Sequence, residues 1–325
     1  RKNMMSGSAM IYSMGGLALT GAVAAGAYRL LRRPELTAAE LVAAYATPLP
    51  KPQAALSVYH LGHSLVGRDM PVMLDQLVAA AGYSGHRHHS QLGWGASLDQ
   101  HWRGAEAVPG FATENAHANH RPAQTALASG EYDAVVLTEM VEIRDAIRHH
   151  DSAKSLVRWA KAARAGRPDV RLYLYETWHR LDDPQGWLHR IDSDRVQAWE
   201  GVLLRQAMAV PGVGVIHVIP GGQVLAAVVR AAEAGEIPGL SRREALFASD
   251  ATGQVDPVHL NDLGNHIIAL THFATLYQQS PVGLPHALRR ADGQPATPLP
   301  QTAALPIERL VWQVVSGYAL TGVAG

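Results

Sequence analysis

One serine and one histidine, nearly two hundred positions apart, are of the residue types that could form a nucleophile and its base. Ser64 lies in the segment Gly62-His63-Ser64-Leu65, and His259 follows Asp256 by three positions. A serine hydroxyl is a weak nucleophile until a base takes its proton. The Asp256 carboxylate can hold one ring nitrogen of His259 so that the other faces Ser64. The spacing therefore predicts a Ser64–His259–Asp256 triad.

The elements around Ser64 are of the kind that expose a nucleophile. Residues 57–63 alternate like a short strand, and Gly62 permits a tight bend before a helix expected over about 70–81. Ser64 would stand at the carboxyl end of that strand, where backbone N–H groups at the start of the helix point toward a bound substrate. Asp256 and His259 are expected on a loop stiffened by Pro257.

Strand and helix patterns alternate through the middle of the chain. The clearest strands cover 132–139, 170–176 and 213–219, and helices are expected between and after them, at about 152–165, 194–209, 221–234 and 267–277. This alternation predicts a three-layer α/β/α fold with a doubly wound, mostly parallel sheet. Sites in such sheets collect beyond the carboxyl ends of the strands. The residues expected at those ends or on the turns beyond them are Ser64, Gly95, Thr138, Glu139 and Trp178.

Two glycines flank Trp94, so the turn at Gly93-Trp94-Gly95 can adopt conformations closed to other residues. Such a turn could aim the Gly95 N–H at a reacting carbonyl oxygen, and an ordinary strand-to-helix turn explains the same residues equally well. Trp94 could line a substrate cleft, as could Trp178, although buried packing is the commoner place for tryptophan.

Composition excludes several classes of function. The chain has 325 residues, a formal net charge of zero and no cysteine, so thiolate metal sites, disulfides and a cysteine nucleophile are absent. Zero net charge argues against a broad nucleic-acid-binding face. His86 and His88 would share one face of a strand, but no cysteine or carboxylate follows nearby in sequence. We predict no metal and no cofactor.

The terminal regions differ from the middle in composition. Residues 9–31 are apolar with basic flanks, which predicts a signal peptide or membrane-anchor helix within 1–33 and an exported or membrane-anchored protein. A Gly/Ala-rich buried or surface helix is the alternative. Residues 34–54 are expected to be a linker that contains a short helix capped by Thr37, 55–280 the main domain, and 281–325 a Pro-rich tail whose last short helix packs on that domain.

These motifs resemble the GDSL/SGNH hydrolase superfamily. Gly62-His63-Ser64-Leu65 is similar to the family's Gly-Asp-Ser-Leu block, with His63 in place of the acidic residue, and Asp256-Pro257-Val258-His259 is similar to its Asp-x-x-His block. The resemblance implies a serine esterase with Ser64 as nucleophile, His259 as base and then acid, and Asp256 as orienter. It also implies an oxyanion hole from the N–H groups of Ser64 and Gly95, and an ester substrate that is a small molecule or a glycan.

One family block is missing. The family places an oxyanion-binding Asn after a middle strand, where this chain has Thr138-Glu139. Thr138 is the expected substitute and Glu139 the less favoured one, while His63, Trp94 and Trp178 are expected to line the substrate site. Two alternatives follow: a weak or inactive SGNH-like domain that binds a glycan or a membrane, and an O-acyltransferase that uses the same triad.

Overall fold

The structure is a computed structural model that describes residues 33–324. The apolar segment 9–31 lies outside the described residues. Residues 36–325 form one compact unit. Among the helices of residues 33–324, none combines the length and apolar character needed to cross a bilayer.

The centre of this unit is a five-stranded parallel sheet with the order β2-β1-β3-β4-β5. Its strands are β1 (Ser57–His63), β2 (Arg87–Gly93), β3 (Ala134–Leu137), β4 (Arg171–Glu176) and β5 (Ile216–Pro220). The chain runs from β1 outward to β2 and then returns to β3 on the other side. The carboxyl ends of β1 and β3 therefore lie at the switch point of a doubly wound sheet, where ligands bind in such folds.

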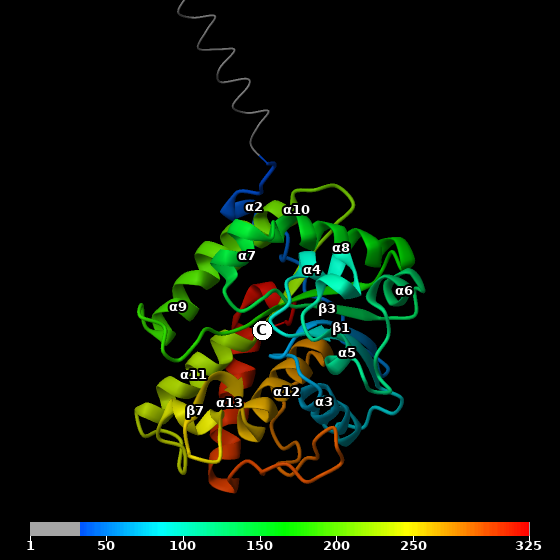
Figure 1. Cartoon of the computed structure of the whole chain (residues 1–325). Coiled ribbons are helices and arrows are strands. Elements are labelled where there is room, and N and C mark those ends of the chain that lie inside the picture. The colour runs from blue at the N-terminus through cyan, green and yellow to red at the C-terminus, as the bar shows by residue number, and fades with distance from the viewer. Residues whose placement is uncertain (1–32, 325) are drawn as a thin grey trace, which may run out of the picture. The chain divides into compact units, whose positions relative to one another are not determined.

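Helices cover both faces of the sheet and make it the middle of three layers, as predicted (Figure 1). One face carries α3 (Asp69–Ala80), α11 (Gly221–Glu233), α12 (Asp262–Tyr277) and α13 (Gln301–Gly317). The other carries α2 (Ala38–Ala43), α4 (Leu98–Arg103), α6 (Ala123–Ala128), α7 (Ile143–His149) and α8 (Ser152–Gly166). Each layer buries its own apolar cluster against the sheet, which explains the continuous apolar runs of the strands.

One helical run joins the two clusters. It comprises α9 (Trp187–Asp194), the π-helix η2 (Arg195–Leu204) and α10 (Arg205–Met208). Trp187 and Ile191 belong to the first cluster, and Leu203 and Leu204 to the second. The helix expected at 194–209 is thus the later part of a longer run. The remaining short elements are η1 (Ala105–Ala107), α5 (Phe111–Glu114), η3 (Arg243–Leu246) and η4 (Ala319–Thr321).

Asp256 and His259 lie on a strand, not on the loop that Pro257 led us to expect. β7 (Val255–Leu260) pairs antiparallel with β6 (Phe247–Ser249) in a separate two-stranded sheet. Because this is a two-stranded sheet, β7 has an unpaired edge, and an edge strand tolerates a proline that cannot donate a hydrogen bond. The triad's acid and base are therefore held on a strand that ends at the start of α12.

Residues 36–54 are packed on the domain and are not a free linker. Thr37 and Glu40 form the expected capping box of α2, and Leu41 and Tyr45 are buried in the second cluster. The Tyr45 hydroxyl donates to the carbonyl of Ile216 in β5 at 2.6 Å. At the other end, α13 contacts α11 and α12.

Candidate active site

The structure brings the three residues of the proposed triad together. Ser64 Oγ lies 2.9 Å from His259 Nε2, and His259 Nδ1 lies 3.0 Å from Asp256 Oδ2. Ser64 comes from the turn after β1, whereas the other two come from β7. In this arrangement Nδ1 carries a proton toward the carboxylate, and Nε2 is left to accept the serine proton.

Asp256 is held as a carboxylate by its own backbone. Its Oδ1 accepts the N–H groups of Val258 at 2.8 Å and His259 at 2.7 Å, which leaves Oδ2 for the imidazole. Partial burial would raise the pKa of Asp256, but these two donors and the His259 ring outweigh it and lower the pKa from its usual value. The acid is thus negative at neutral pH and can fix the His259 tautomer.

Two neutral histidines brace the serine turn. His63 Nε2 donates to the carbonyl of Glu139 at 2.8 Å, and His63 Nδ1 accepts the N–H of Leu65 at 3.3 Å. His101 Nε2 donates to the carbonyl of Gly62 at 2.8 Å. Burial lowers the pKa of both rings to about 4. The prediction that His63 lines the substrate site is wrong, because this ring is fully buried and both of its nitrogens are hydrogen-bonded to the backbone.

Gly62 is needed for close packing at the same turn. A Cβ at this position would lie 2.8 Å from Cβ of Thr138 and 2.9 Å from Cγ2 of Val66, closer than real Cβ atoms approach their neighbours. The carboxyl ends of β1 and β3 can therefore approach only because residue 62 has no side chain.

The segment after β4 holds β7 in place. Trp178 Nε1 donates to the carbonyl of Val258 at 2.8 Å, and the Leu181 N–H donates to the carbonyl of Pro257 at 2.7 Å. Both acceptor carbonyls belong to residues that lie between Asp256 and His259 in sequence. Trp178 thus supports the acid–base pair, a role that sequence reasoning missed because it depends on a contact 80 positions away.

A cavity of about 210 Å³ opens at the serine. Its lining residues are Ser64, Leu65, Gly67, Arg68, Asp69, Trp178, His259, Leu260 and Asn265. Trp178 is among them, as expected from its place after β4. Arg68 and Asn265 were not singled out from the sequence. The sequence could have indicated that Arg68 lies near the site, because it follows Ser64 by four positions on the turn into α3.

The predicted oxyanion donors fall in different surroundings. Gly93 pairs with His63, so the loop after β2 that carries Gly95 runs beside the serine turn. Gly95 has φ +55° and open space around the position of a Cβ, so its backbone is accessible. Thr138, in contrast, is fully buried, and its Oγ1 has no hydrogen-bond partner within residues 33–324. Its donation to an oxyanion stays a prediction, and the burial argues against direct contact.

Glu139 is fully buried and hydrogen-bonded to the backbone. Its Oε1 accepts the N–H groups of Leu98 at 3.2 Å and Met140 at 2.8 Å, and burial raises the pKa of Glu139 to about 7. These bonds tie the end of β3 to the start of α4.

Trp94 packs against a neighbouring turn. Its ring lies over Gly110, and its Nε1 donates to Glu114 at 2.8 Å. Trp94 is 55% exposed and is not among the residues that line the cavity at Ser64. Its predicted substrate-lining place is therefore not supported by the structure.

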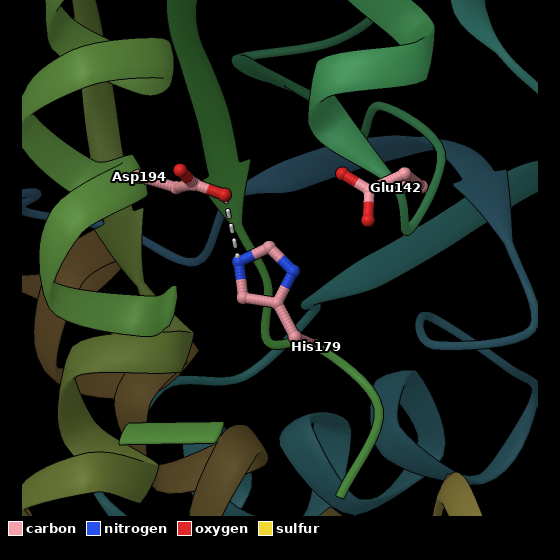
Figure 2. Close-up of side chains that lie close together, drawn as sticks. All are labelled: Glu142, His179 and Asp194. Carbon is pink, nitrogen blue, oxygen red and sulfur yellow. Dashed lines mark ion pairs between the residues drawn. The ribbon is translucent and has the colours of Figure 1, made fainter. Parts of the chain in front are cut away.

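One group of side chains has metal-ligand types at short range. Glu142, His179 and Asp194 place their ligand atoms within 4.8 Å of one another, and His179 Nε2 lies 3.3 Å from Asp194 (Figure 2). Both carboxylates are already neutralised, however. Arg190 Nη2 donates to Glu142 at 2.8 Å and to Asp194 at 3.0 Å, and Arg144 Nη2 donates to the other oxygen of Asp194 at 2.8 Å.

The arginines make this group an ion network instead of a metal site. A cation would have to displace guanidinium groups that already satisfy the carboxylates. Arg190 also pairs with Asp183, on the segment that follows Trp178. The network therefore anchors the segment that supports β7.

Comparisons with known proteins support the fold. No protein-family model matches the sequence, and no curated protein matches it. A crystal structure of a DUF4886 family protein from Bacteroides uniformis is similar to this chain with a TM-score of 0.53 and 16% identity, over 80% of this chain and 95% of the other. A candidate GDSL-like lipase from Parabacteroides merdae is similar with a TM-score of 0.44 and 14% identity, over 70% and 99%.

The chain shares a three-layer α/β/α fold with the DUF4886 family protein. The parallel sheet of order β2-β1-β3-β4-β5, a serine turn directly after β1 and an Asp-x-x-His segment directly before α12 together match the expectation from the sequence motifs. Likeness at this level of identity describes the architecture alone, and the reaction has to be argued from the site itself.

Proposed function

We propose that this SGNH-like domain is a serine hydrolase that cleaves an ester of a small molecule or glycan through an acyl-enzyme. The observation that carries the proposal is the continuous path from Ser64 Oγ to His259 Nε2 at 2.9 Å and from His259 Nδ1 to Asp256 at 3.0 Å. Nucleophile, base and orienter within hydrogen-bond reach of one another are the geometric signature of an activated serine.

Each residue has one task in the proposed reaction. Ser64 Oγ attacks the ester carbonyl while His259 Nε2 takes its proton, and the Ser64 and Gly95 N–H groups stabilise the oxyanion. His259 then gives the proton to the departing alcohol, which leaves an acyl group on Ser64. A water molecule, deprotonated by His259, attacks this acyl group and restores the serine.

The size of the cavity favours a short acyl group. At about 210 Å³ it is smaller than the roughly 300–1,000 Å³ of sites for drug-sized ligands. We therefore expect p-nitrophenyl acetate or butyrate to be cleaved faster than esters of eight or more carbons.

A fluorophosphonate probe and a p-nitrophenyl ester series test the proposal together. Wild type should be labelled at Ser64 and should turn over short esters, whereas Ser64→Ala should lose both labelling and turnover. His259→Ala should lose turnover because no base remains. Ser84→Ala and His149→Ala, which alter exposed residues away from the cavity, serve as matched controls. Equal turnover by wild type, Ser64→Ala and His259→Ala would overturn the proposal.

A further inference from the structure

A second cavity adjoins the one at the serine. It has a volume of about 160 Å³ and shares Gly67 and Arg68 with the first. Both residues lie on the turn between Ser64 and α3. Arg68 therefore lies where a ligand bound at Ser64 could extend into the second cavity.

The second cavity is rich in hydrogen-bond donors. Its polar lining residues are Arg68, His88, Ser90, His117 and Asn119, and no carboxylate is among its lining residues. The nearby acidic groups already accept hydrogen bonds, and Asp69 does so from the N–H of Ala291, a lining residue, at 2.8 Å. Asp75 accepts from His88 Nδ1 at 2.9 Å, and Glu114 accepts from Trp94.

Arg68 has donors to spare. Its Nη2 donates to the carbonyl of Thr113, and within residues 33–324 its guanidinium has no ion-pair partner. A guanidinium offers five N–H donors in a fixed fork that fits carboxylate, phosphate or sulfate oxygens. The contact with Thr113 holds the side chain in place, which reduces the entropy lost on binding.

A second unmatched group belongs to a residue that lines the same cavity. His117 Nε2 is shielded from solvent and has no hydrogen-bond partner among the described residues. Asn119 Nδ2 donates one hydrogen to His88 Nε2 at 2.9 Å and keeps a second. Buried polar groups without partners are uncommon in folded proteins, and those at binding sites find their partner in the ligand.

We propose that the second cavity binds an oxyanion group, a carboxylate, phosphate or sulfate, carried by the ester whose carbonyl lies at Ser64. Arg68 supplies the charge and His117 and Asn119 add neutral donors. The natural substrate is then an anionic ester. We place the anion in the second cavity because no carboxylate is among its lining residues, whereas Asp69 lines the first; the Asp69 Oδ1 atom accepts the N–H of Ala291 at 2.8 Å. This proposal rests on the esterase function proposed above.

A pair of esters that differ only in charge tests the proposal. In 4-carboxyphenyl acetate and 4-carbamoylphenyl acetate a carboxylate is replaced by an amide of the same shape, and the 3-substituted isomers extend the series to a second geometry. Wild type should prefer the carboxylate in at least one geometry. Arg68→Gln should lower the ratio of kcat/KM between the anionic and the neutral ester by about 10- to 100-fold, the range expected for a lost charge-assisted bond.

Two controls accompany the ratio. Arg148→Gln removes an exposed arginine of α7 and should leave the ratio unchanged. Arg68→Lys keeps the charge but loses the fork and should restore only part of the preference. A wild-type enzyme that treats the charged and neutral esters alike, or an Arg68→Gln variant with the wild-type ratio, would overturn the anion site.

Binding to the inactive variant separates this proposal from the first. Calorimetry on Ser64→Ala should show tighter binding of 4-carboxyphenyl acetate than of its amide, and this difference should be lost in Ser64→Ala/Arg68→Gln. If the wild type neither hydrolyses esters nor reacts with a fluorophosphonate while this binding difference persists, the esterase function fails and the anion site stands. If the wild type is labelled and turns over esters but the variants show no binding difference, the esterase function stands and the anion site fails.

Discussion

At the residue scale, the two oxygens of Asp256 have separate partners. Oδ1 accepts two backbone N–H groups and Oδ2 faces His259 Nδ1. In Asp256→Asn the amide oxygen can keep the backbone bonds, which turns the NH₂ group toward the imidazole. His259 must then carry its proton on Nε2, where it can no longer accept one from Ser64. We expect kcat to fall by about 10³–10⁴-fold with p-nitrophenyl acetate.

The matched control for this change is Asp192→Asn. Asp192 is half exposed and pairs with Arg230, so its loss should leave kcat unchanged. An Asp256→Asn variant that keeps more than a tenth of wild-type kcat would show that the carboxylate does not set the His259 tautomer.

Thr138 provides a second test at the residue scale. If its hydroxyl donated to the oxyanion, Thr138→Val would lower kcat by about 10²–10³-fold. The side chain is fully buried and packs beside Gly62, so we expect this nearly isosteric change to alter kcat by less than about threefold. Steady-state kinetics with p-nitrophenyl acetate distinguish the two results, and a loss of 10²-fold or more would establish the hydroxyl as an oxyanion donor.

At the element scale, the segment after β4 acts as a support for β7. Trp178→Phe keeps most of the aromatic volume but removes the donor to the Val258 carbonyl. The lost bond should let the Asp256–His259 strand move away from Ser64. We expect kcat to fall about fivefold, from the roughly 1 kcal/mol that a neutral hydrogen bond contributes, while KM for p-nitrophenyl acetate changes less.

Trp159→Phe is the comparison for Trp178→Phe. Trp159 is also buried and also donates from Nε1 to a backbone carbonyl, that of Leu98, but it lies on α8. Both variants should lose some stability in urea, whereas only Trp178→Phe should lower kcat. Equal kinetic effects would mean that the Trp178 change acts through general destabilisation.

The elements differ in how far the sequence could predict them. β1, the turn at Ser64 and α3 were predicted because local signals set them: an apolar alternation, a glycine and a helix pattern. The meeting of Ser64 with His259 was predicted from the residue types, the Asp-x-x-His spacing and the family resemblance of the two motifs. β7 was expected to be a loop because its pairing with β6 is a contact between distant segments, which local propensity does not report.

Contacts between distant segments also explain what sequence reasoning missed at the site. Arg68 is one charged residue in a turn, and its position between two cavities depends on β2 and on the segment at 117–119. The same limit applies to His101, whose bond to Gly62 crosses 39 positions. His63 was placed in the substrate site because it precedes Ser64, but side chains on either side of a turn point in different directions.

At the scale of the whole molecule, the domain buries an unusual number of histidines in neutral form. Burial lowers the pKa of six of them to about 4: His63, His86, His101, His217, His266 and His272. Two glutamates show the opposite shift, since burial raises the pKa of Glu139 to about 7 and of Glu176 to about 8. Each shift couples stability to pH, because the folded and unfolded states bind different numbers of protons.

The six histidines and two glutamates together predict a stability maximum near pH 7. On the acid side, histidines of the unfolded chain bind protons while the buried rings of the folded protein stay neutral. Stability therefore falls as the pH drops through about 6.5 toward 4. The glutamates act in the opposite sense from about pH 4.5 upward, where the unfolded ones are ionised while the folded ones keep their protons until about pH 7 and 8. They partly offset the histidines on the acid side and make stability fall above the maximum. The acid side should be steeper because more groups contribute, each about 1.4 kcal/mol per pH unit.

Urea unfolding from pH 4.5 to 8.5 measures this curve. His266→Gln should flatten the acid side by one proton, and His149→Gln, at an exposed position, should not. A curve that is flat between pH 5 and 6.5 would show that these histidines are protonated in the folded protein.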